Sequence, residues 1–508
     1  MSGRAIIKDD TSRIKYELEL FLLSGESQLY EDGRLIASIA AANCAAEISF
    51  GKLILSAWGD GWSRSWRVVS CEVAPEALLL QCTKQMGRTE CRVELRRGQL
   101  DDKAAQSRAE FAEKIAAMIE SSFAHLKVER AVTARDDLRH FSGVHTRLVI
   151  KERNQSIAAV AVSERESQSD IDAALAAGII WLDALRRKNQ SINRLMIFAP
   201  RERATTIATR LTAVQVRGAS VSLYEVNEAE RSIEPVAPFD QGDLDDRMRR
   251  AARRAEWPRK RAFSPEIAAL VDSVVGLAPD LIETSSRAGR IAFSIRGLQF
   301  ARASINRKLI EFGLSEPKQK LDDANQLELA SLVAEIITSR QPDSESRNDL
   351  IFRAQAEAWL ESIIRRDITA IDPALDPRFV YSQVPAYRGN KRSFIDLLAA
   401  TRAGQLVVIE LKVAEDAEFP FQGLDYWLRV EWHRARGDFE RRGYFKGLKI
   451  ADAAPLVYLV APLFRFHATT KLVAGSIAAR APVYRIGINE DWRSRVRVLL
   501  NERLNPEE

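Results

Sequence analysis

The sequence predicts a multidomain α/β protein. Its 508 residues are too many for one hydrophobic core, and at roughly 150 residues per domain they suggest three or four folding units. Short apolar runs separated by glycine-containing turns fill residues 14–100, a pattern typical of antiparallel strands. A helix, strands, a second helix and another strand then occur in the same order in residues 110–235 and 352–495. The predicted architecture is therefore a β-rich N-terminal domain followed by two α/β domains.

Composition excludes several classes of protein. Hydrophobic residues make up 46% and charged residues 29% of the chain, which is ordinary for globular proteins and unlike disordered or fibrous ones. Glu17 and Glu19 interrupt the only apolar stretch near the N-terminus, so no secretion signal is predicted. No apolar run approaches the length of about 18 residues that a membrane helix needs. A cytoplasmic location without membrane contact is expected.

Four cysteines, all in the N-terminal part, show no spacing typical of metal ligands. They are Cys44, Cys71, Cys82 and Cys91. Without a CxxC pair or a nearby histidine we expect reduced cysteines in a core. A zinc site is the alternative.

Residues 1–102 form the predicted β-rich domain, with runs such as KYELELFLL, KLILSAW and SWRVVSCEV as strands. Trp58, Trp62 and Trp66 lie close together around one turn. They could stack on nucleic-acid bases or pack into the domain core. Nucleic-acid binding by this domain is thus one of two interpretations.

Basic residues are concentrated in one short segment. Residues 103–238 form a predicted α/β domain, and residues 239–340 a basic linker followed by a small helical/β module. In this linker, residues 247–261 hold eight basic residues and one acidic residue. The net charge of the whole chain is +5, so the rest sums to −2 (5 − 7). Such a segment is either an exposed linker or an electrostatic contact for nucleic acid.

The most informative residues lie in the last predicted domain, residues 341–508. Asp396 stands in the apolar run FIDLLAA, and Glu410 and Lys412 stand two apart in the run VVIELKV. The side-chain period of a strand is two, so residues 410 and 412 should share a face that Asp396 can reach from the neighbouring strand. Two such carboxylates would bind Mg²⁺ or Mn²⁺ through oxygen, and Lys412 would orient or deprotonate a water.

A purely structural alternative exists for these three charges. They could form a salt-bridged group on the solvent face of a half-exposed sheet. Continuous apolar runs, however, are typical of strands that are buried on both faces. Charges there are costly unless they have partners or a function, so we favour the functional interpretation.

Spacing and order give this domain a resemblance to a known superfamily. Asp396, a spacer of thirteen residues and then Glu410, Leu411 and Lys412 resemble the PD-(D/E)XK nucleases, with Ile395 in place of the proline. Gln422 and Tyr426 match the QxxxY motif of the RecB-type branch, and residues 392–413 also resemble NucS-like endonucleases. The resemblance covers about 150 residues of the chain and implies a restriction-endonuclease-like αβββαβ core.

The resemblance also implies roles for individual residues. Asp396, Glu410 and the Leu411 carbonyl would bind the metal, and Lys412 would assist the attacking water. Gln422 and Tyr426 would lie near the site. Members of the superfamily often add a glutamate from the first helix, for which Glu361 is preferred to Glu357, although both could simply lie on a solvated helix face.

The predicted repeat differs at these positions. With AAVAVSE aligned under VVIELKV, at an offset of 249 residues, Asp396 falls on Arg147, Glu410 on Ala161 and Lys412 on Ser163. No metal site is retained, so residues 103–238 are expected to be a degenerate copy. It could arrange domains, make contacts in a homodimer or bind nucleic acid.

These observations predict a divalent-metal-dependent nuclease that hydrolyses phosphodiester bonds in DNA, in repair, restriction or phage defence. The choice between endonuclease and exonuclease stays open. One alternative is a catalytically inactive nucleic-acid-binding or assembly scaffold with nuclease-like folds. Another is a nuclease that acts on RNA.

Overall fold

A computed structural model gives the fold of the chain. It describes residues 5–506 apart from short gaps, at residues 9, 24–26, 40–43, 50–51, 60–61, 75–76, 85–88, 98–101, 134–142, 189–190, 241, 243–264, 288, 315–317, 344–349 and 389–390. The basic segment 247–261 lies outside these described residues. The chain divides into two compact units, residues 1–101 with 260–359 and residues 102–259 with 360–508. The protein is a multidomain α/β protein with four sheets.

The first unit contains two antiparallel sheets. The N-terminal sheet has the order β3-β2-β8-β7-β6-β5-β4, with β1 paired to β6. Its strands are β1 (Ala5–Lys8), β2 (Ser27–Glu31), β3 (Arg34–Ile39), β4 (Cys44–Ser49), β5 (Lys52–Gly59), β6 (Trp62–Ala74), β7 (Ala77–Lys84) and β8 (Thr89–Arg97). The second sheet holds β15 (Ile282–Arg287), β16 (Arg290–Ile295), β17 (Leu298–Ser304), β18 (Leu309–Phe312) and β19 (Gln319–Lys320), with helices α7 (Pro265–Val275), α8 (Gln326–Ser339) and α9 (Leu350–Arg353).

One predicted strand of the N-terminal domain is a helix. The run KYELELFLL belongs to helix α1 (Thr11–Leu23). Its apolar residues Ile14, Leu18 and Phe21 are buried, which is the spacing of one helical face. The prediction of a strand was wrong. Glutamate and leucine alternate in ELEL with the period of two that is typical of a strand, whereas the longer apolar pattern has the helical period.

Aromatic and sulfur side chains of this domain pack inside it. Trp66 is 1% exposed, and its indole nitrogen donates to Glu31 Oε1 at 2.5 Å. Trp66 is therefore not available to stack on bases, and the side chains of Trp58 and Trp62 lie outside the described residues. The four cysteines are buried without disulfides, as predicted. Burial raises the pKa of the Cys71 thiol to about 12, which disfavours the thiolate that zinc would need.

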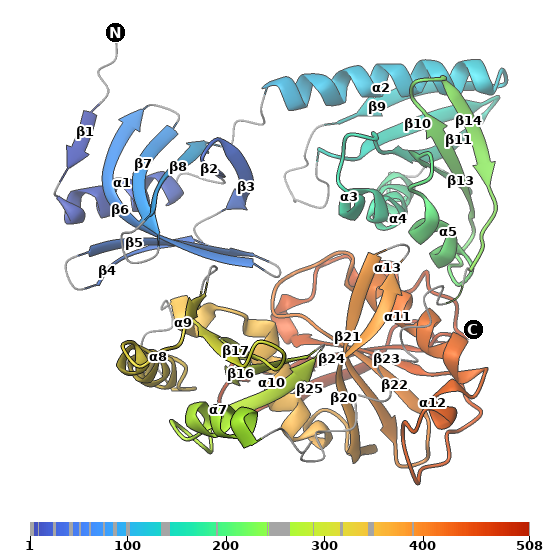
Figure 1. Ribbon diagram of the computed structural model, residues 1–508. Helices are drawn as coiled ribbons and strands as arrows, with labels where there is room; N and C mark the ends of the chain where they lie inside the picture. Colours follow the sequence, from blue (N-terminus) through green and yellow to red (C-terminus); the bar gives the residue numbers. More distant parts are fainter. Residues whose placement is uncertain are drawn as a thin grey trace. The chain divides into compact units, whose positions relative to one another are not determined.

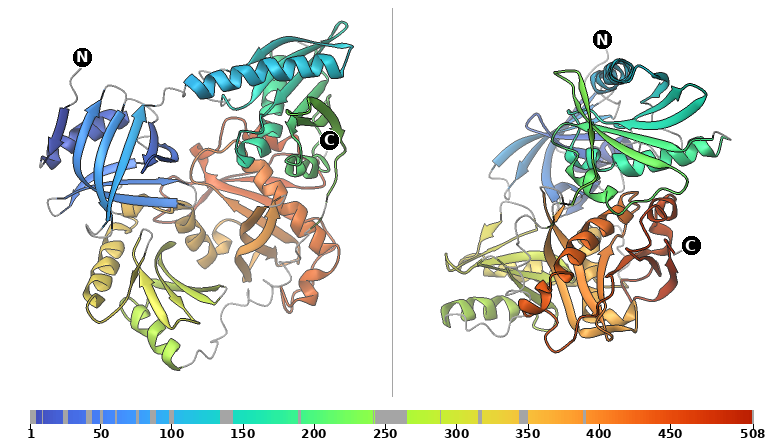
Figure 2. Two further views of the ribbon diagram at one scale, coloured as in Figure 1. Left: turned by 45° about the horizontal axis from the view of Figure 1, so that its top comes forward. Right: turned by 90° about the vertical axis from the view of Figure 1, so that its right-hand side faces the viewer.

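The second unit contains two six-stranded sheets with helices on their faces, shown in Figure 1 and from two further directions in Figure 2. The first sheet follows helix α2 (Asp102–Ser122). Its strands are β9 (Leu126–Val132), β10 (Thr146–Glu152), β11 (Gln155–Ala161), β12 (Arg194–Pro200), β13 (Ser220–Asn227) and β14 (Ser232–Val236), and its other helices are α3 (Gln168–Asp172), α4 (Ala174–Arg186) and α5 (Thr205–Leu211).

The second sheet of this unit follows helix α10 (Ala356–Arg366). Its strands are β20 (Leu375–Arg388), β21 (Lys391–Thr401), β22 (Leu406–Leu411), β23 (Leu456–Pro462), β24 (Val483–Ile488) and β25 (Val498–Arg503). The helical segments are η2 (Ile368–Ala370), α11 (Phe419–Arg434), α12 (Asp438–Arg441), η3 (Leu463–Arg465) and α13 (Thr470–Ala474). Helix α11 connects the parallel strands β22 and β23, as α4 connects β11 and β12.

The two sheets share one topology. Their orders are β14-β13-β12-β11-β10-β9 and β20-β21-β22-β23-β24-β25. In both sheets the first three strands along the chain form two antiparallel pairs. The next two pairs are parallel, and the last strand is again antiparallel to its neighbour. Each crossover helix also has a glycine close to the next parallel strand, Gly178 beside Leu195 and Gly423 beside Val457 and Leu459. This is the arrangement that the predicted repeat requires.

The two crossover helices share one hydrophobic core. Apolar residues of β11, β12, α4 and α5 pack in the same cluster as residues of α11, β23 and α13. A backbone bridge joins Val214 to Ile477, and Gln215 N donates to Ser476 O at 2.7 Å. The helices between the sheets therefore bury their apolar faces against one another, so helix α11 is held from two domains.

None of the helices within the described residues is both long and apolar enough to cross a membrane.

The close approach of α11 to β23 yields a first prediction. A Cβ at Gly423 would lie 2.7 Å from Val457 Cγ1 and 3.0 Å from Leu459 Cδ2, so Gly423→Ala must push the helix off the sheet. Overpacking of this kind typically costs about 1–3 kcal/mol. Urea unfolding should show this loss. Gly178→Ala is the matched control, since its Cβ would meet only side-chain atoms of Leu195 at 3.3 Å; an equal loss for both would contradict the packing described.

Candidate functional site

Two carboxylates meet across neighbouring strands of the last sheet. Leu397 of β21 pairs with Ile409 of β22, and one further step of this register places Asp396 beside Glu410. Glu410 also pairs with Leu459 of β23, whose side chain contacts Gly423 of α11. Paired residues point to the same face of a sheet, so Glu410 lies on the face that α11 covers. The structure thus brings together the two acidic residues that the sequence singled out.

Burial dominates the electrostatics of this pair. Glu410 is 5% exposed. Burial raises the pKa of Asp396, while the hydrogen bond from the Leu411 amide, the charge of Lys412 and hydrogen bonds from Gln383 and Glu410 lower it. The Leu411 amide donates to Asp396 Oδ2 at 2.9 Å. Because N–H and C=O of one strand residue point to the same side, the Leu411 carbonyl also points toward β21 and Asp396.

Lys412 lies one residue beyond the end of β22, and its amide still bonds to Val460 O at 3.0 Å. Its ammonium lies 3.9 Å from Asp416 Oδ2, and Gln422 donates to the same oxygen at 2.8 Å. Asp416 therefore links Lys412 to the first turn of α11. No sequence motif marks Asp416, although its position six residues before Gln422 places it just before the helix.

Tyr426 lies one turn after Gln422 on α11. Its hydroxyl and that of Ser393 on β21 are 2.6 Å apart. Burial raises the pKa of Tyr426 far above its usual value, and the negative charges of Glu410 and Asp396 raise it further. The tyrosine therefore stays protonated, facing the carboxylate pair.

Gln383 is a site residue that the motif search missed. On β20 it lies opposite Asp396, between Ser382, which pairs with Leu397, and Val384, which pairs with Ile395. Its φ of 51° is left-handed, which is unfavourable for glutamine. Its amide donates to Asp396 Oδ1 at 3.3 Å and to Glu361 Oε2 at 2.8 Å. Opposite residues of neighbouring strands lie on the same face of a sheet, so the side chain of Gln383 lies on the face that carries Asp396.

Glu361 is thereby the helix glutamate that connects to Asp396, through Gln383. The carboxylate oxygens of Asp396 and Glu410 with the Leu411 carbonyl are the donor types that Mg²⁺ and Mn²⁺ prefer. In the described part of the chain no three His, Cys, Asp or Glu side chains are already grouped for a metal; magnesium is often held by one or two carboxylates with water and substrate phosphate.

The repeat has no carboxylate pair at the corresponding place. Leu195 of β12 contacts Gly178 of α4 and pairs with Ala158, so Ala158 and Val160 face the crossover helix. Val160 pairs with Arg147. On the face that the crossover helix covers, Arg147 therefore takes the place of Asp396, and Val160 takes the place of Glu410. The offset of 249 had assigned Ala161, which points to the opposite face; counting by sequence alone does not reveal which face a helix covers.

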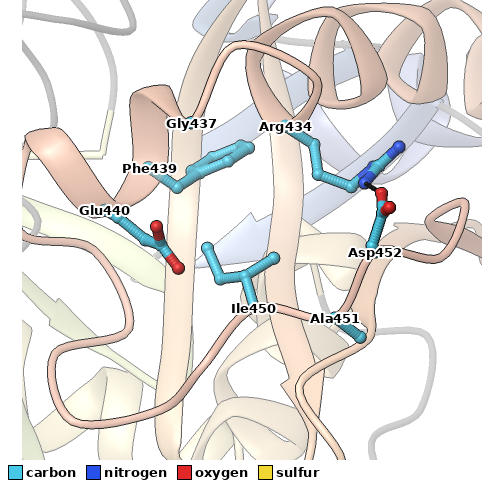
Figure 3. A pocket seen from close by; sticks show the side chains of 7 residues that line it. All are labelled: Arg434, Gly437, Phe439, Glu440, Ile450, Ala451 and Asp452. Carbon is cyan, nitrogen blue, oxygen red and sulfur yellow. Dashed lines mark hydrogen bonds and ion pairs between the residues drawn. The ribbon is translucent and has the colours of Figure 1, made fainter.

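A shallow pocket lies elsewhere in the same domain (Figure 3). Its volume is about 160 Å³, and it is lined by Arg434, Gly437, Phe439, Glu440, Ile450, Ala451 and Asp452. Arg434 donates to Asp452 Oδ1 at 2.9 Å and to Glu431 Oε2 at 2.7 Å, so two carboxylates neutralise its charge. The pocket shares no residue with the carboxylate site.

No protein-family model matches this chain, and no curated protein is similar to it in sequence. Among solved structures, a match is found to the protein VC1899 from Vibrio cholerae, with 13% sequence identity, coverage of 58% of this chain and 72% of that chain, and a TM-score of 0.14. A TM-score of this size does not establish a common fold, and no conclusion about the site depends on it.

The raised pKa of Asp396 predicts a dependence of stability on pH. Its contribution to stability is fully present below its ordinary pKa of 3.8 and is lost as the pH rises through the higher pKa of the folded protein. Without metal, Asp396→Asn should remove this loss and make the protein relatively more stable at neutral pH. Denaturant unfolding at a series of pH values measures it.

Asp376→Asn is the control, because hydrogen bonds from Arg378 lower the pKa of Asp376 and its contribution is instead lost as the pH falls. A wild type and an Asp396→Asn variant with parallel stability curves would show that the pKa of Asp396 is not raised in the folded protein.

Proposed function

We propose that the domain formed by residues 341–508 is a divalent-metal-dependent nuclease that hydrolyses phosphodiester bonds in DNA. The observation that carries the proposal is the meeting of Asp396 and Glu410 on the buried face under α11, beside Lys412. Two carboxylates on an otherwise apolar face are costly to bury, and a cation bound between them would offset that cost. The resemblance of the motif to PD-(D/E)XK nucleases points to the same chemistry.

Asp396, Glu410 and the Leu411 carbonyl would hold the metal. When bound, a Mg²⁺ or Mn²⁺ ion supplies a Lewis acid that polarises a phosphoryl oxygen and acidifies water. Lys412 would direct the attacking water and offset developing negative charge, with Asp416 fixing its position. Tyr426, protonated and hydrogen-bonded to Ser393, would donate a hydrogen bond near the carboxylates, and Glu361 would be held toward the site by Gln383.

DNA is the proposed substrate, in repair, restriction or phage defence. The chemistry at phosphorus is the same for RNA, so the substrate must be decided by measurement. The test is a cleavage panel of single-stranded, double-stranded and branched DNA together with RNA, with Mg²⁺ or Mn²⁺. Wild type should cleave at least one DNA substrate, and circular substrates separate endonuclease from exonuclease activity.

Single substitutions make the panel decisive. Asp396→Ala and Lys412→Ala should each lower the rate by at least about a hundredfold, a typical loss for a group that acts in the transition state. Asp376→Asn serves as the carboxylate control, because Asp376 pairs with Arg378 outside the proposed set, and it should retain wild-type rates. Equal cleavage by wild type and Asp396→Ala would refute the proposal, as would intact substrates under every condition. Cleavage of RNA alone would show that RNA, and not DNA, is the substrate.

A further inference from the structure

Arg210 joins the degenerate domain to the helix that borders the carboxylate site. It lies on α5 with 0% exposure. Its guanidinium donates to Asp425 Oδ1 at 2.9 Å and Oδ2 at 3.0 Å, to Glu418 Oε2 at 2.8 Å and to the Asp172 carbonyl at 2.7 Å. The positive charge of Arg210 is thus paired with two carboxylates, that of Asp425 in α11 and that of Glu418 at the N-cap position of α11.

Glu418 connects this ion cluster to Lys412. It caps the N-terminus of α11, and its backbone amide donates to Asp416 Oδ1 at 2.8 Å. Its backbone carbonyl accepts from the Gln422 amide at 2.9 Å. The other oxygen of Asp416 accepts from the Gln422 side chain at 2.8 Å and lies 3.9 Å from the Lys412 ammonium. A continuous polar chain therefore runs from Arg210 through Glu418 and Asp416 to Lys412.

A second tie holds the same helix from the segment that follows this domain. Arg429 of α11 is buried and donates to Asp240 Oδ1 at 2.5 Å and to the Gly242 carbonyl. Residues 240 and 242 follow the last strand of the degenerate domain. Helix α11 is thus fixed near its first turn by Arg210 and farther along by Arg429.

We propose that Arg210 is a positioning residue for the nuclease site, and that the degenerate domain serves to set the first turn of α11 and, through Asp416, the place of Lys412. A guanidinium group carries five N–H donors in a rigid plane, so it can hold two carboxylates at once in a defined geometry. General apolar packing does not do this. The proposal rests on the proposed function for its catalytic consequence only. The structural link itself can be measured without any cleavage assay.

The test uses the full-length protein in three variants. Arg210→Met removes the guanidinium. Glu418→Gln removes the ion pair of residue 418 with Arg210, through which Arg210 holds the backbone that bonds Asp416, while Asp425 still pairs with Arg210. Arg186→Met is the matched control, because Arg186 also lies in the degenerate domain and donates to three backbone carbonyls, of Ile192, Arg217 and Gly218, none of which belongs to α11. If Arg210→Met does not fold, Glu418→Gln decides the question alone.

Two readouts report on the link directly. Competitive labelling of lysines with acetic anhydride, followed by peptide mass spectrometry, measures the reactivity of Lys412. Hydrogen exchange measures the protection of residues 412–426. Arg210→Met and Glu418→Gln should speed both the labelling of Lys412 and exchange in this segment, whereas Arg186→Met should leave both at wild-type rates.

Kinetics then tests the catalytic consequence. On a substrate that wild type cleaves, the two variants should lower kcat roughly tenfold or more with KM within about twofold, the pattern of an interaction used in the transition state. Unchanged Lys412 labelling and unchanged exchange in both variants would overturn the proposal. Altered labelling in a protein that cleaves no nucleic acid would support the link and refute the proposed function, so the two failures are distinct.

Discussion

Helix α11 packs against charged groups in an otherwise apolar interior. The arrangement of the second unit follows from the need to satisfy those charges. On one side it covers the buried Glu410, which lies beside Asp396, and on another its own Asp425 meets the fully buried Arg210. Buried charge destabilises a fold unless partners satisfy it. The helix therefore occupies a position that satisfies both groups. In this position Tyr426 lies near the charges of Glu410 and Asp396, and Gln422 bonds to Asp416.

Two copies of one topology have diverged around this helix and its counterpart α4. In one copy the face beneath the crossover helix keeps an acidic pair, whereas in the other the corresponding places hold Arg147 and Val160. Arg147 lies with its guanidinium carbon 5.4 Å from the centre of the Trp181 ring on α4, so a cation–π contact replaces the acidic pair. The domain formed by residues 103–238 supplies Arg210, which pairs with Asp425 of α11.

Local patterns in the sequence predicted much of the site. Strand β21 occupies the residues that its apolar run indicated, and the period of two in a strand was enough to place Asp396 and Glu410 on one face. The left-handed backbone of Gln383 could not be predicted, because nothing in FVYSQVPAY marks such a residue that is not glycine. Nor could the ion pair of Arg210 with Asp425, whose partners lie 215 residues apart and meet only when two domains pack. Helix α1 was missed because its charges imitate strand alternation.

A Mn²⁺ titration followed by electron paramagnetic resonance tests the carboxylate site most directly, since it measures binding before any question of substrate. Wild-type protein should bind Mn²⁺, and Asp396→Asn and Glu410→Gln should each weaken that binding by at least about tenfold, because each removes a charged oxygen ligand. Asp376→Asn, which changes a carboxylate of the same domain outside the site, should bind as wild type does. Identical Mn²⁺ binding by wild type and both site variants would contradict the assignment of Asp396 and Glu410 as metal ligands.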